Sequence, residues 1–431
     1  MLTDVTNWAR YPKSCSTVLS LSSALRGLPA LENGVTALPF GMGRSLGDSC
    51  LNDGQVVLVT TGMNAVLRFD ASTGLLDAEA GITFDDILRF AIPAGWFLPV
   101  TPGTRYVTLG GAIANDVHGK NHHVAATFGH HVRGLELLRS DGSRVWCSPR
   151  ENAEWFRATV GGLGLTGLIT RAQLQLKPVV NSWIDAEAIR FGDINEFYAL
   201  TDQSAHDYEY VVAWVDTLST RTLGRGVLFR GNHSTDTRRS ERAPLRDALI
   251  AAPPLPFQLL SNPTIRLFNN AFYWLRKSHA QSRSAIAPFF YPLDALGAYH
   301  RIYGPKGMLQ WQALLPHRDA VDGVLRAARR LGGSFLSVVK VMGGAPNVGL
   351  MSFSGAGVTI ALDFPYSDSV LRQLPLLDEL VRDAGGRLYP AKDARMSGAM
   401  FRATFPQWSE FERYIDPRFS SSFWRRVMID R

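Results

Sequence analysis

The chain has 431 residues, of which 46% are hydrophobic and 19% charged, and its formal net charge is +7. This length and composition exclude a disordered or fibrous chain and are ordinary for a soluble globular protein of two or three domains. A basic balance admits anionic partners, but the sequence has no block of five or six like charges and no zinc-finger spacing, so we do not expect nucleic-acid binding.

Targeting signals are not evident. The amino terminus lacks a basic start followed by a long apolar run, so no secretory signal is expected. No stretch of about 18 apolar residues occurs, so no transmembrane segment is expected. The expected location is therefore cytoplasmic or peripheral at the inner membrane.

Residues 35–180 are expected to alternate short strands and helices. The β-rich runs VTALPFG, QVVLVTTG and GLLDAEAG predict strands, and GLELLRSDGSRVWCS predicts a hairpin around Asp141-Gly142. The run TFDDILRFAIPAG predicts a helix with Thr83 as its N-cap and Gly95 at its end. NAEWFRATVGG predicts another short helix, and GLITRAQLQLKP predicts a strand that Pro178 ends.

The pattern changes after about residue 181. EYVVAWVDT, GMLQWQALLP and GVTIALDFP predict strands, while AVDGVLRAARRLGG and DSVLRQLPLLDELVRDAGG predict amphipathic helices closed by glycine. These runs favour a second α+β domain with a large sheet. Between them, residues 240–284 are rich in proline, aromatics and arginine with little periodicity. This span fits entrance loops, a surface that meets a membrane, or a loosely patterned helical insertion.

Three segments are dense in glycine: PFGMGRSLGDS, TPGTRYVTLGGAIANDVHGKNHH and TVGGLGLTG. Glycine lets the backbone turn tightly and present N–H groups to an anion or to a flat ligand. The first segment alone is a weak signal, and it fails the dinucleotide fingerprint of the Rossmann fold. Three such segments in one domain favour a large, extended ligand such as a flavin dinucleotide.

The histidines of the second segment raise the possibility of a metal site. We expect HGKNHH to be extended, so the neighbouring side chains of His122 and His123 point to opposite faces and cannot share one ion with His118. His130 and His131 face the same obstacle. Because no nearby cysteine or paired carboxylate completes a ligand set, no metal is predicted.

The three glycine segments together with GGRLYPAKDAR resemble the FAD-linked oxidases of the vanillyl-alcohol-oxidase/p-cresol-methylhydroxylase superfamily. The similarity runs from about residue 35 to the C-terminus. It implies an α+β, two-domain FAD-binding fold of the p-cresol-methylhydroxylase type, with a large antiparallel sheet in the substrate domain. The implied domains are residues 1–181 for FAD, 182–386 for substrate, and 387–431 as a return to the FAD-binding domain.

Site residues carried over from the family fall into three groups. The residues implied for cofactor binding are Gly41, Met42, Gly43, Arg44, Ser45, Gly47, Asp48, Ser49, Gly103, Thr108, Gly110, Gly111, His118, Gly119, Lys120, Asn121, Ile169, Tyr389 and Lys392. Those implied for substrate binding are Trp214, Arg301, Gln310, Gln312 and Lys340. The catalytic candidates are Lys392, as a fixed cation for charge on the reduced flavin, and His118, for which a cofactor-positioning role is favoured over proton abstraction.

The resemblance also implies an activity. Within the superfamily the chain is most similar to the branch that oxidises the 2′-hydroxyl of a polyprenyl-phosphate-linked ribose to a ketone, after which a short-chain keto-reductase gives the arabinose epimer for cell-wall arabinan. Related oxidases with covalent flavin carry a histidine where this chain has Arg44, so non-covalent FAD is expected. Peripheral membrane contact is expected through residues 240–284.

Five residues around the implied pocket depart from the family pattern. They are Leu46, Phe290-Tyr291, Met342 and Ala361. These departures keep a second hypothesis open, an FAD-dependent oxidase of a soluble sugar, alditol or aldonolactone. A third hypothesis is a non-catalytic scaffold or membrane-binding module, against which the intact glycine loops and Lys392 argue.

Overall fold

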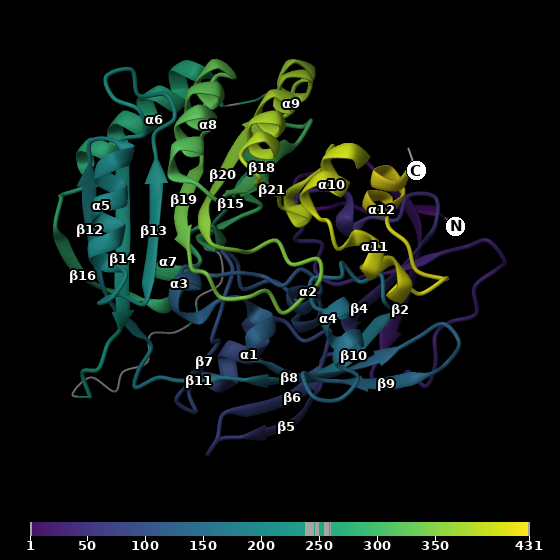
Figure 1. Ribbon diagram of the computed structural model, residues 1–431. Helices are drawn as coiled ribbons and strands as arrows, with labels where there is room; N and C mark the ends of the chain where they lie inside the picture. Colours follow the sequence, from purple (N-terminus) through teal and green to yellow (C-terminus); the bar gives the residue numbers. More distant parts are fainter. Residues whose placement is uncertain (1, 238–244, 246–249, 254–257, 259, 430–431) are drawn as a thin grey trace.

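A computed structural model of the chain describes residues 2–237, 245, 250–253, 258 and 260–429. Figure 1 shows a large sheet with helices on its outer side, and smaller sheets formed by the first 180 residues below and beside it. The C-terminal helices return to the side of the molecule where the N-terminus lies.

The first 180 residues form two main sheets. A four-stranded sheet has the order β1 (Leu2–Asp4), β2 (Cys15–Ser22), β4 (Val56–Gly62), β3 (Ala37–Phe40). A five-stranded antiparallel sheet has the order β5 (Val66–Asp70), β6 (Leu75–Glu79), β10 (Leu168–Gln175), β8 (Val132–Leu138), β9 (Arg144–Cys147). A further pair joins β7 (Trp96–Phe97) to β11 (Lys177–Pro178). The predicted hairpin at Asp141-Gly142 is confirmed as the β8–β9 connection.

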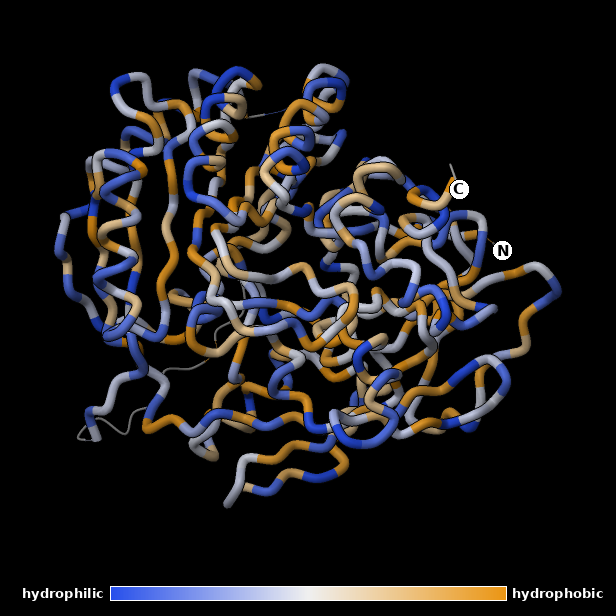
Figure 2. The backbone as a smooth tube through the Cα atoms, in the orientation of Figure 1, coloured by the Kyte–Doolittle hydropathy of each residue, from blue (hydrophilic) through white to orange (hydrophobic). Residues whose placement is uncertain are grey.

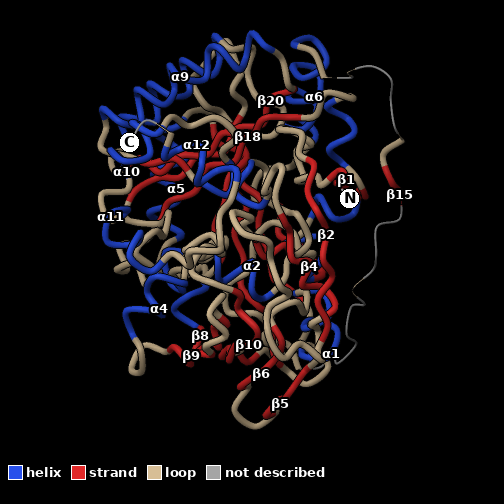
Figure 3. The backbone as a smooth tube through the Cα atoms, turned by 90° about the vertical axis from the view of Figure 1, so that its right-hand side faces the viewer, coloured by secondary structure: helices blue, strands red, loops and turns tan. Residues whose placement is uncertain are grey.

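Short helices join these strands. They are α1 (Phe84–Ala91), α2 (Leu109–Ala114), α3 (His122–Ala125) and α4 (Ala153–Thr159), with 3-10 turns η1 (Asp48–Cys50) and η2 (Phe128–His131). The predicted cap is confirmed, because the Thr83 side chain accepts from the Asp86 N–H and the Asp86 carboxylate accepts from the Thr83 N–H. Both views place α2 between the large sheet and the five-stranded sheet, so the second glycine segment lies in the middle of the molecule (Figures 1 and 3).

An eight-stranded, fully antiparallel sheet dominates the second half of the chain. Its order is β16 (Ala280–Ala285), β12 (Trp183–Phe191), β14 (Gly226–His233), β13 (Tyr210–Val215), β19 (Ser337–Met342), β20 (Gly357–Pro365), β18 (Met308–Leu315), β21 (Arg387–Leu388). The runs read as strands from the sequence fall on β13, β18 and β20. The predicted α+β class with a large antiparallel sheet is confirmed.

Amphipathic helices cover one face of this sheet. These long helices are α5 (Ile194–Ser204), α8 (Arg318–Arg330) and α9 (Asp368–Asp383). A fourth long helix, α6 (Asn262–Leu275), lies on the other side of the sheet (Figure 3), where Phe272 contacts Trp214. In α8, Val321, Val324, Leu325 and Ala328 recur at helical spacing and are all buried. Figure 2 shows the apolar colour concentrated along the strands beneath them. Burial of these two apolar faces against each other holds the helices on the sheet.

The last residues return to the N-terminal sheets. They form α10 (Gly398–Thr404), α11 (Trp408–Phe411), η6 (Glu412–Tyr414) and α12 (Ser422–Met428). Backbone bonds fasten them, since the Ala37 N–H donates to the Arg418 carbonyl (2.8 Å) and the Ser422 N–H donates to the Leu51 carbonyl (2.7 Å). The C-terminal segment thus braces the strand that precedes the first glycine loop.

The region from residue 240 to 284 contains more regular structure than the sequence suggested. Residues 240–244, 246–249, 254–257 and 259 lie outside the described residues, and the remainder forms β15 (Ile250–Ala251), α6 and the edge strand β16. A connector follows, with α7 (Ile286–Phe290), η3 (Pro292–Ala295), β17 (Leu296–Gly297) and η4 (Tyr299–Tyr303). Among the described residues, no helix has the length and apolar character needed to cross a bilayer.

Candidate active site

A cavity of about 960 Å³ joins segments that lie far apart in the sequence. Its walls come from the three glycine segments, the strands of the large sheet, and the turn η5 (Pro390–Lys392). This volume is at the upper end of the range for small-molecule and cofactor sites. The sequence-predicted residues that line it are Gly41, Met42, Gly43, Arg44, Ser45, Ser49, Gly103, Thr108, Gly110, Gly111, His118, Gly119, Lys120, Ile169, Trp214, Gln310, Gln312, Lys340, Tyr389 and Lys392.

Two predicted loop residues, Gly47 and Asp48, do not line the cavity but contact the C-terminal segment next to it. A Cβ on Gly47 would lie 1.6 Å from the Asp393 carbonyl oxygen, so only glycine allows the first loop to touch this C-terminal segment. The Asp48 carboxylate accepts from both Nε and Nη2 of Arg426 on α12 (2.8 and 2.7 Å). These contacts fix the first glycine loop to the segment that carries Lys392.

Two other predicted residues also lie outside the cavity wall. The Asn121 amide donates to the Pro99 carbonyl (2.9 Å) and so ties the end of the second glycine segment to the residues just before its start. Arg301, on η4, donates from Nη1 to the Ala252 carbonyl (3.0 Å), and the structure does not bring it to the predicted substrate pocket.

Unpartnered polar atoms at the cavity wall show that the site is built for a polar ligand. Within the described part of the chain, Arg44 Nε, Ser49 Oγ, Asn115 Oδ1 and Gln310 Oε1 are buried without a hydrogen-bond partner, and all four residues line the cavity. Buried polar groups normally have partners. Donors and acceptors spread around glycine-rich backbone suit the phosphates, ribityl hydroxyls and ring heteroatoms of FAD.

Arg44 is held in a fixed position beside the first loop. Its guanidinium lies 4.1 Å from the centroid of the Trp8 ring, and Nη1 donates to the Met42 carbonyl (3.0 Å). Removal from bulk water lowers the pKa of Arg44, while Asp294 acts in the opposite direction. The side chain thus presents a preorganised cation to the cavity.

A chain of hydrogen bonds connects the second glycine segment to the large sheet. Lys340 Nζ, on β19, lies 2.6 Å from His118 Nδ1 and donates to the Gly119 carbonyl (2.6 Å). On the other side of the imidazole, Gln312 Nε2 lies 3.2 Å from His118 Nε2 and 3.0 Å from Thr359 Oγ1. Lys340 is buried, and burial lowers its pKa to about 7 with help from the nearby Lys120.

Lys392 faces the cavity beside a buried carboxylate. Burial lowers the pKa of Lys392 to about 8, and Asp363 on β20 opposes that shift. Burial raises the pKa of Asp363 to about 6. The hydrogen bonds that its carboxylate accepts from the Gln310 amide and from Tyr303 Oη act in the opposite direction and lower the pKa. At neutral pH the two groups are therefore mainly an ammonium and a carboxylate.

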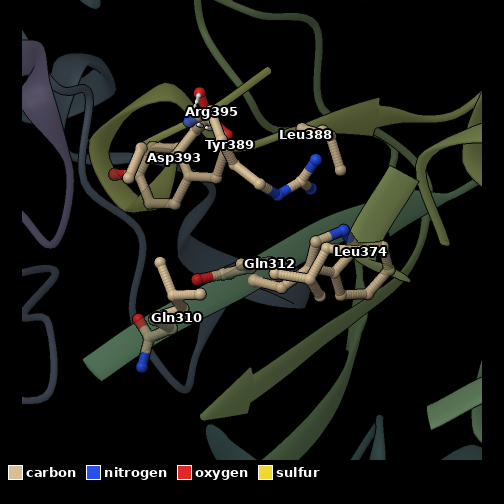
Figure 4. A pocket seen from close by; sticks show the side chains of 10 residues that line it. Gln310, Gln312, Leu374, Leu388, Tyr389, Asp393 and Arg395 are labelled. Atoms are coloured by element: carbon tan, nitrogen blue, oxygen red, sulfur yellow. Dashed lines mark hydrogen bonds between the residues drawn. The ribbon is translucent and has the colours of Figure 1, made fainter. Parts of the chain in front are cut away.

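Figure 4 shows how the C-terminal turn is attached to this sheet. The segment that carries Tyr389, Asp393 and Arg395 runs beside the strand of Gln310 and Gln312. The Tyr389 N–H donates to the Gln312 carbonyl (2.9 Å), which sets the register between η5 and β18. This attachment positions Lys392 in the cavity wall.

One part of the cavity wall is aromatic. Trp214 lies 4.8 Å from Phe272 between ring centroids, and Phe268 lies 4.8 Å from Phe335. Arg276 covers the Phe272 ring at 4.9 Å. This aromatic arm comprises Trp214, Phe229, Phe268, Phe272, Arg276 and Phe335. The cavity wall therefore combines polar groups with apolar surface.

The histidine-rich stretch has a different conformation from the one expected. His122–Ala125 is a single helical turn. The prediction that HGKNHH is extended, from which metal binding was excluded, is therefore wrong. The His122 ring accepts from the Gly343 N–H (3.1 Å), and the His123 ring contacts the Tyr208 carbonyl (3.0 Å). No group of three potential metal ligands occurs among the residues that the structure describes.

Several residues of the site were not found from the sequence. Asp363, Thr359 and Asn115 carried no recognisable motif, because their importance depends on which strands and helices become neighbours. A signal did exist for Asp363, since an acidic residue within the apolar run GVTIALDFP requires a partner once that strand is buried.

Known proteins are similar in sequence to this chain, both in the region of the first two glycine segments and over nearly the whole length. Residues 17–148 match the FAD binding domain family. The chain is 35% identical to the decaprenylphosphoryl-beta-D-ribose oxidase of Mycolicibacterium smegmatis, over 98% of this chain and 96% of that one. It is 31% identical to an uncharacterised protein of Streptomyces coelicolor, over 80% of this chain and all of that one. Cytokinin dehydrogenase 10 of Oryza sativa is 28% identical over 44% of this chain.

The fold, the glycine-lined cavity and these similarities together define an FAD-dependent oxidoreductase. The match over nearly the whole length places the chain more narrowly: it belongs to the family of the decaprenylphosphoryl-beta-D-ribose oxidase. The resemblance drawn from the sequence motifs is confirmed.

Proposed function

We propose that the protein oxidises the 2′-hydroxyl of a polyprenyl-phosphate-linked ribose to the 2′-keto sugar. The observation that carries this proposal is the mixed character of the cavity wall. The same cavity holds the cofactor loops, the polar groups of His118, Gln312 and Lys340, and the aromatic arm. Five aromatic side chains offer nothing to the hydroxyls of a free sugar, whereas a prenyl chain can bury its apolar surface against them.

Different residues of the cavity have different proposed roles in this reaction. When bound, FAD accepts the hydride that leaves the sugar carbon. The glycine segments hold the cofactor, and Lys392 provides a fixed ammonium where negative charge develops, with Asp363 keeping that ammonium charged at neutral pH. Gln310 offers an unpartnered amide oxygen to a sugar hydroxyl.

A substrate panel tests the proposal. The FAD-loaded protein is mixed without oxygen with a short-chain polyprenyl-phosphoryl ribose, with free ribose, with an alditol and with an aldonolactone, while the visible flavin band is recorded. Rapid bleaching by the lipid-linked ribose alone is expected. Bleaching by an alditol or aldonolactone in preference to it would establish the soluble-sugar alternative, and no bleaching by any compound would favour a non-catalytic role.

The cofactor is proposed to be held without a covalent bond. Arg44 stands where a histidine would be needed for a flavin linkage through the first loop, and its guanidinium is already engaged with Trp8 and Met42. Acid precipitation is expected to release all the flavin into the supernatant. Flavin that stays with the precipitated chain, and fluoresces with it on a denaturing gel, would contradict this prediction.

Helix α6 is proposed to rest on an anionic membrane surface, so that a lipid-linked substrate reaches the aromatic arm directly. Its outer face leaves Leu267 72%, Trp274 60% and Leu275 83% exposed, while Phe268 and Phe272 of the same helix line the cavity. Arg266 and Lys277 are exposed beside these apolar side chains. Apolar side chains flanked by cations are typical of helices that lie in the membrane interface.

Co-sedimentation with vesicles that contain anionic lipid tests this surface. Replacing Leu267, Trp274 and Leu275 together by serine is expected to weaken binding by about tenfold or more, because the apolar area that enters the interface is lost. Leu376→Ser with Leu380→Ser, two exposed leucines of α9, is the matched control. Equal sedimentation of both variants and the natural protein would rule out α6 as the docking surface.

The proposed product requires a second enzyme. A 2′-ketone becomes the arabinose epimer only if a hydride returns to the opposite face of the sugar, and this chain has an oxidising role. A short-chain keto-reductase is therefore the proposed partner in the reaction sequence.

A further inference from the structure

We propose that His118 and Lys340 act together as the acceptor of the proton that the substrate hydroxyl loses. When the substrate hydroxyl replaces the Gln312 amide as the donor to His118 Nε2, this nitrogen takes the proton, and Lys340 Nζ receives the proton that His118 releases from Nδ1. This inference rests on the proposed oxidation of a hydroxyl group and assigns the base for it. It replaces the cofactor-positioning role that the sequence favoured for His118.

The direction of the hydrogen bonds follows from Thr359. Its hydroxyl has one proton, which it donates to the Ala313 carbonyl (3.0 Å). The amide atom of Gln312 that lies 3.0 Å from Thr359 Oγ1 must therefore be the donating nitrogen. The second proton of this amide points to His118 Nε2, 3.2 Å away, so that ring nitrogen accepts.

The same reasoning then fixes the state of Lys340. A neutral imidazole whose Nε2 accepts carries its proton on Nδ1. That N–H faces Lys340 Nζ at 2.6 Å, and an ammonium has no lone pair to accept it. Every hydrogen bond in this series from Thr359 to Gly119 has a donor and an acceptor when Lys340 is an uncharged amine. The amine then accepts from His118 and donates to the Gly119 carbonyl.

The surroundings favour the uncharged amine. The charged or titratable groups around the pair come from three segments. They are Lys120 from the second glycine segment, His122 and His123 from α3, Tyr389, whose ring lies 5.6 Å from that of His118, and Lys392 from η5, which is opposed by Asp363. Burial and Lys120 both act to lower the pKa of Lys340. Burial, Lys340, His122 and Lys392 together hold the pKa of His118 well below its usual range. The doubly protonated, cationic form of His118 is therefore disfavoured, and the ring releases the proton on Nδ1 when Nε2 accepts one.

The atoms and electrons of the step balance. The O–H bond of the substrate breaks as an N–H bond forms at His118 Nε2, while the Nδ1–H bond of His118 breaks as a third N–H bond forms at Lys340 Nζ. The electron pair of the sugar C–H bond leaves as hydride to the FAD that the oxidoreductase holds, and the carbon–oxygen double bond remains. Lys340 is then an ammonium, whose proton is lost to water before the next turnover.

Carbon NMR of the FAD-loaded protein, labelled at the lysine ε-carbons, tests the resting state without any substrate. The chain has seven lysines, and the Lys340 signal is identified by its absence in Lys340→Met, or in Lys340→Arg if the first variant does not fold. The Lys340 signal is expected to titrate near pH 7. A Lys340 signal that titrates above pH 9 would overturn the proposal.

The pH dependence of flavin bleaching by the lipid-linked ribose separates a proton acceptor from a phosphate anchor. In the natural protein the rate should rise with pH to a plateau above about 7, because the amine must be uncharged to accept. Lys340→Arg keeps the charge but cannot accept a proton, so it should lose about 10²-fold or more in bleaching rate.

Two outcomes of that measurement have distinct meanings. A rate that survives in Lys340→Arg, with only weaker substrate binding in Lys340→Met, would make Lys340 an anchor for the phosphate and overturn the proposal. If the lipid-linked ribose bleaches not even the natural protein, the proposed substrate fails. The same pH series is then run with whichever alcohol in the panel does bleach it, and the NMR titration stands independently.

Discussion

Replacement of Lys392 by methionine is expected to slow flavin bleaching by substrate by about 10²- to 10³-fold, the effect of losing one preorganised donor at a developing charge. Lys392 lines the cavity, and the nearby Asp363 carboxylate opposes the loss of its charge. Methionine keeps most of the side-chain volume and removes only the charge. Rapid mixing without oxygen measures the rate directly.

Two controls show whether a slower rate in Lys392→Met comes from the loss of this particular ammonium. Lys306→Met removes an exposed lysine that does not line the cavity and is expected to leave the rate unchanged. Binding of FAD to each stripped protein shows whether the slow step reflects an empty site. An unchanged bleaching rate in fully loaded Lys392→Met would show that Lys392 does not stabilise the charge.

Replacement of Arg426 by methionine is expected to lower the free energy of unfolding by about 3–5 kcal/mol, the cost of leaving buried charges without their partner. Arg426, on α12, donates to both Asp48 (2.7 Å) and Asp393 (2.8 Å), and both carboxylates are nearly inaccessible to water. The interaction joins the first glycine loop to the segment behind Lys392. FAD affinity should therefore fall together with stability.

Urea unfolding at saturating FAD measures this effect. Arg318→Met is the control, because its pair with Asp202 is solvent-exposed and is expected to contribute less than about 1 kcal/mol. Adding Asp48→Asn to Arg426→Met should recover part of the loss, since one of the buried charges is then removed. An Arg426→Met protein as stable as the control would show that the network does not fasten the loop.

The sequence allowed the cofactor side of the site to be predicted well, for physical reasons. Glycine at a tight turn and a capping threonine before a helix are local features, so the loops around Gly43 and Thr108 and the capped helix after Thr83 could be recognised directly. The amphipathic pattern of α8 and α9 is equally local. These features determine most of the elements that surround the cavity.

The remaining parts of the site depend on contacts between distant segments. Thr359 and Gln312 are 47 residues apart and meet only because β18 and β20 are neighbours. Arg301 fits a substrate role by residue type, but the turn that carries it directs the guanidinium to the Ala252 carbonyl. Gly47 fits a phosphate loop, yet its lack of a side chain serves the contact with Asp393. Pairwise geometry of this kind has no sequence pattern.

The position from which hydride leaves the sugar is the central claim, and an isotope experiment tests it most directly. A short-chain polyprenyl-phosphoryl ribose carrying deuterium at C2′ is mixed with the FAD-loaded protein without oxygen, and both the bleaching rate and the label in the product are measured. The account predicts slower bleaching than with the unlabelled compound and a ketone product that has lost its deuterium. Bleaching at the unlabelled rate, with the deuterium retained in the oxidised sugar, would contradict it.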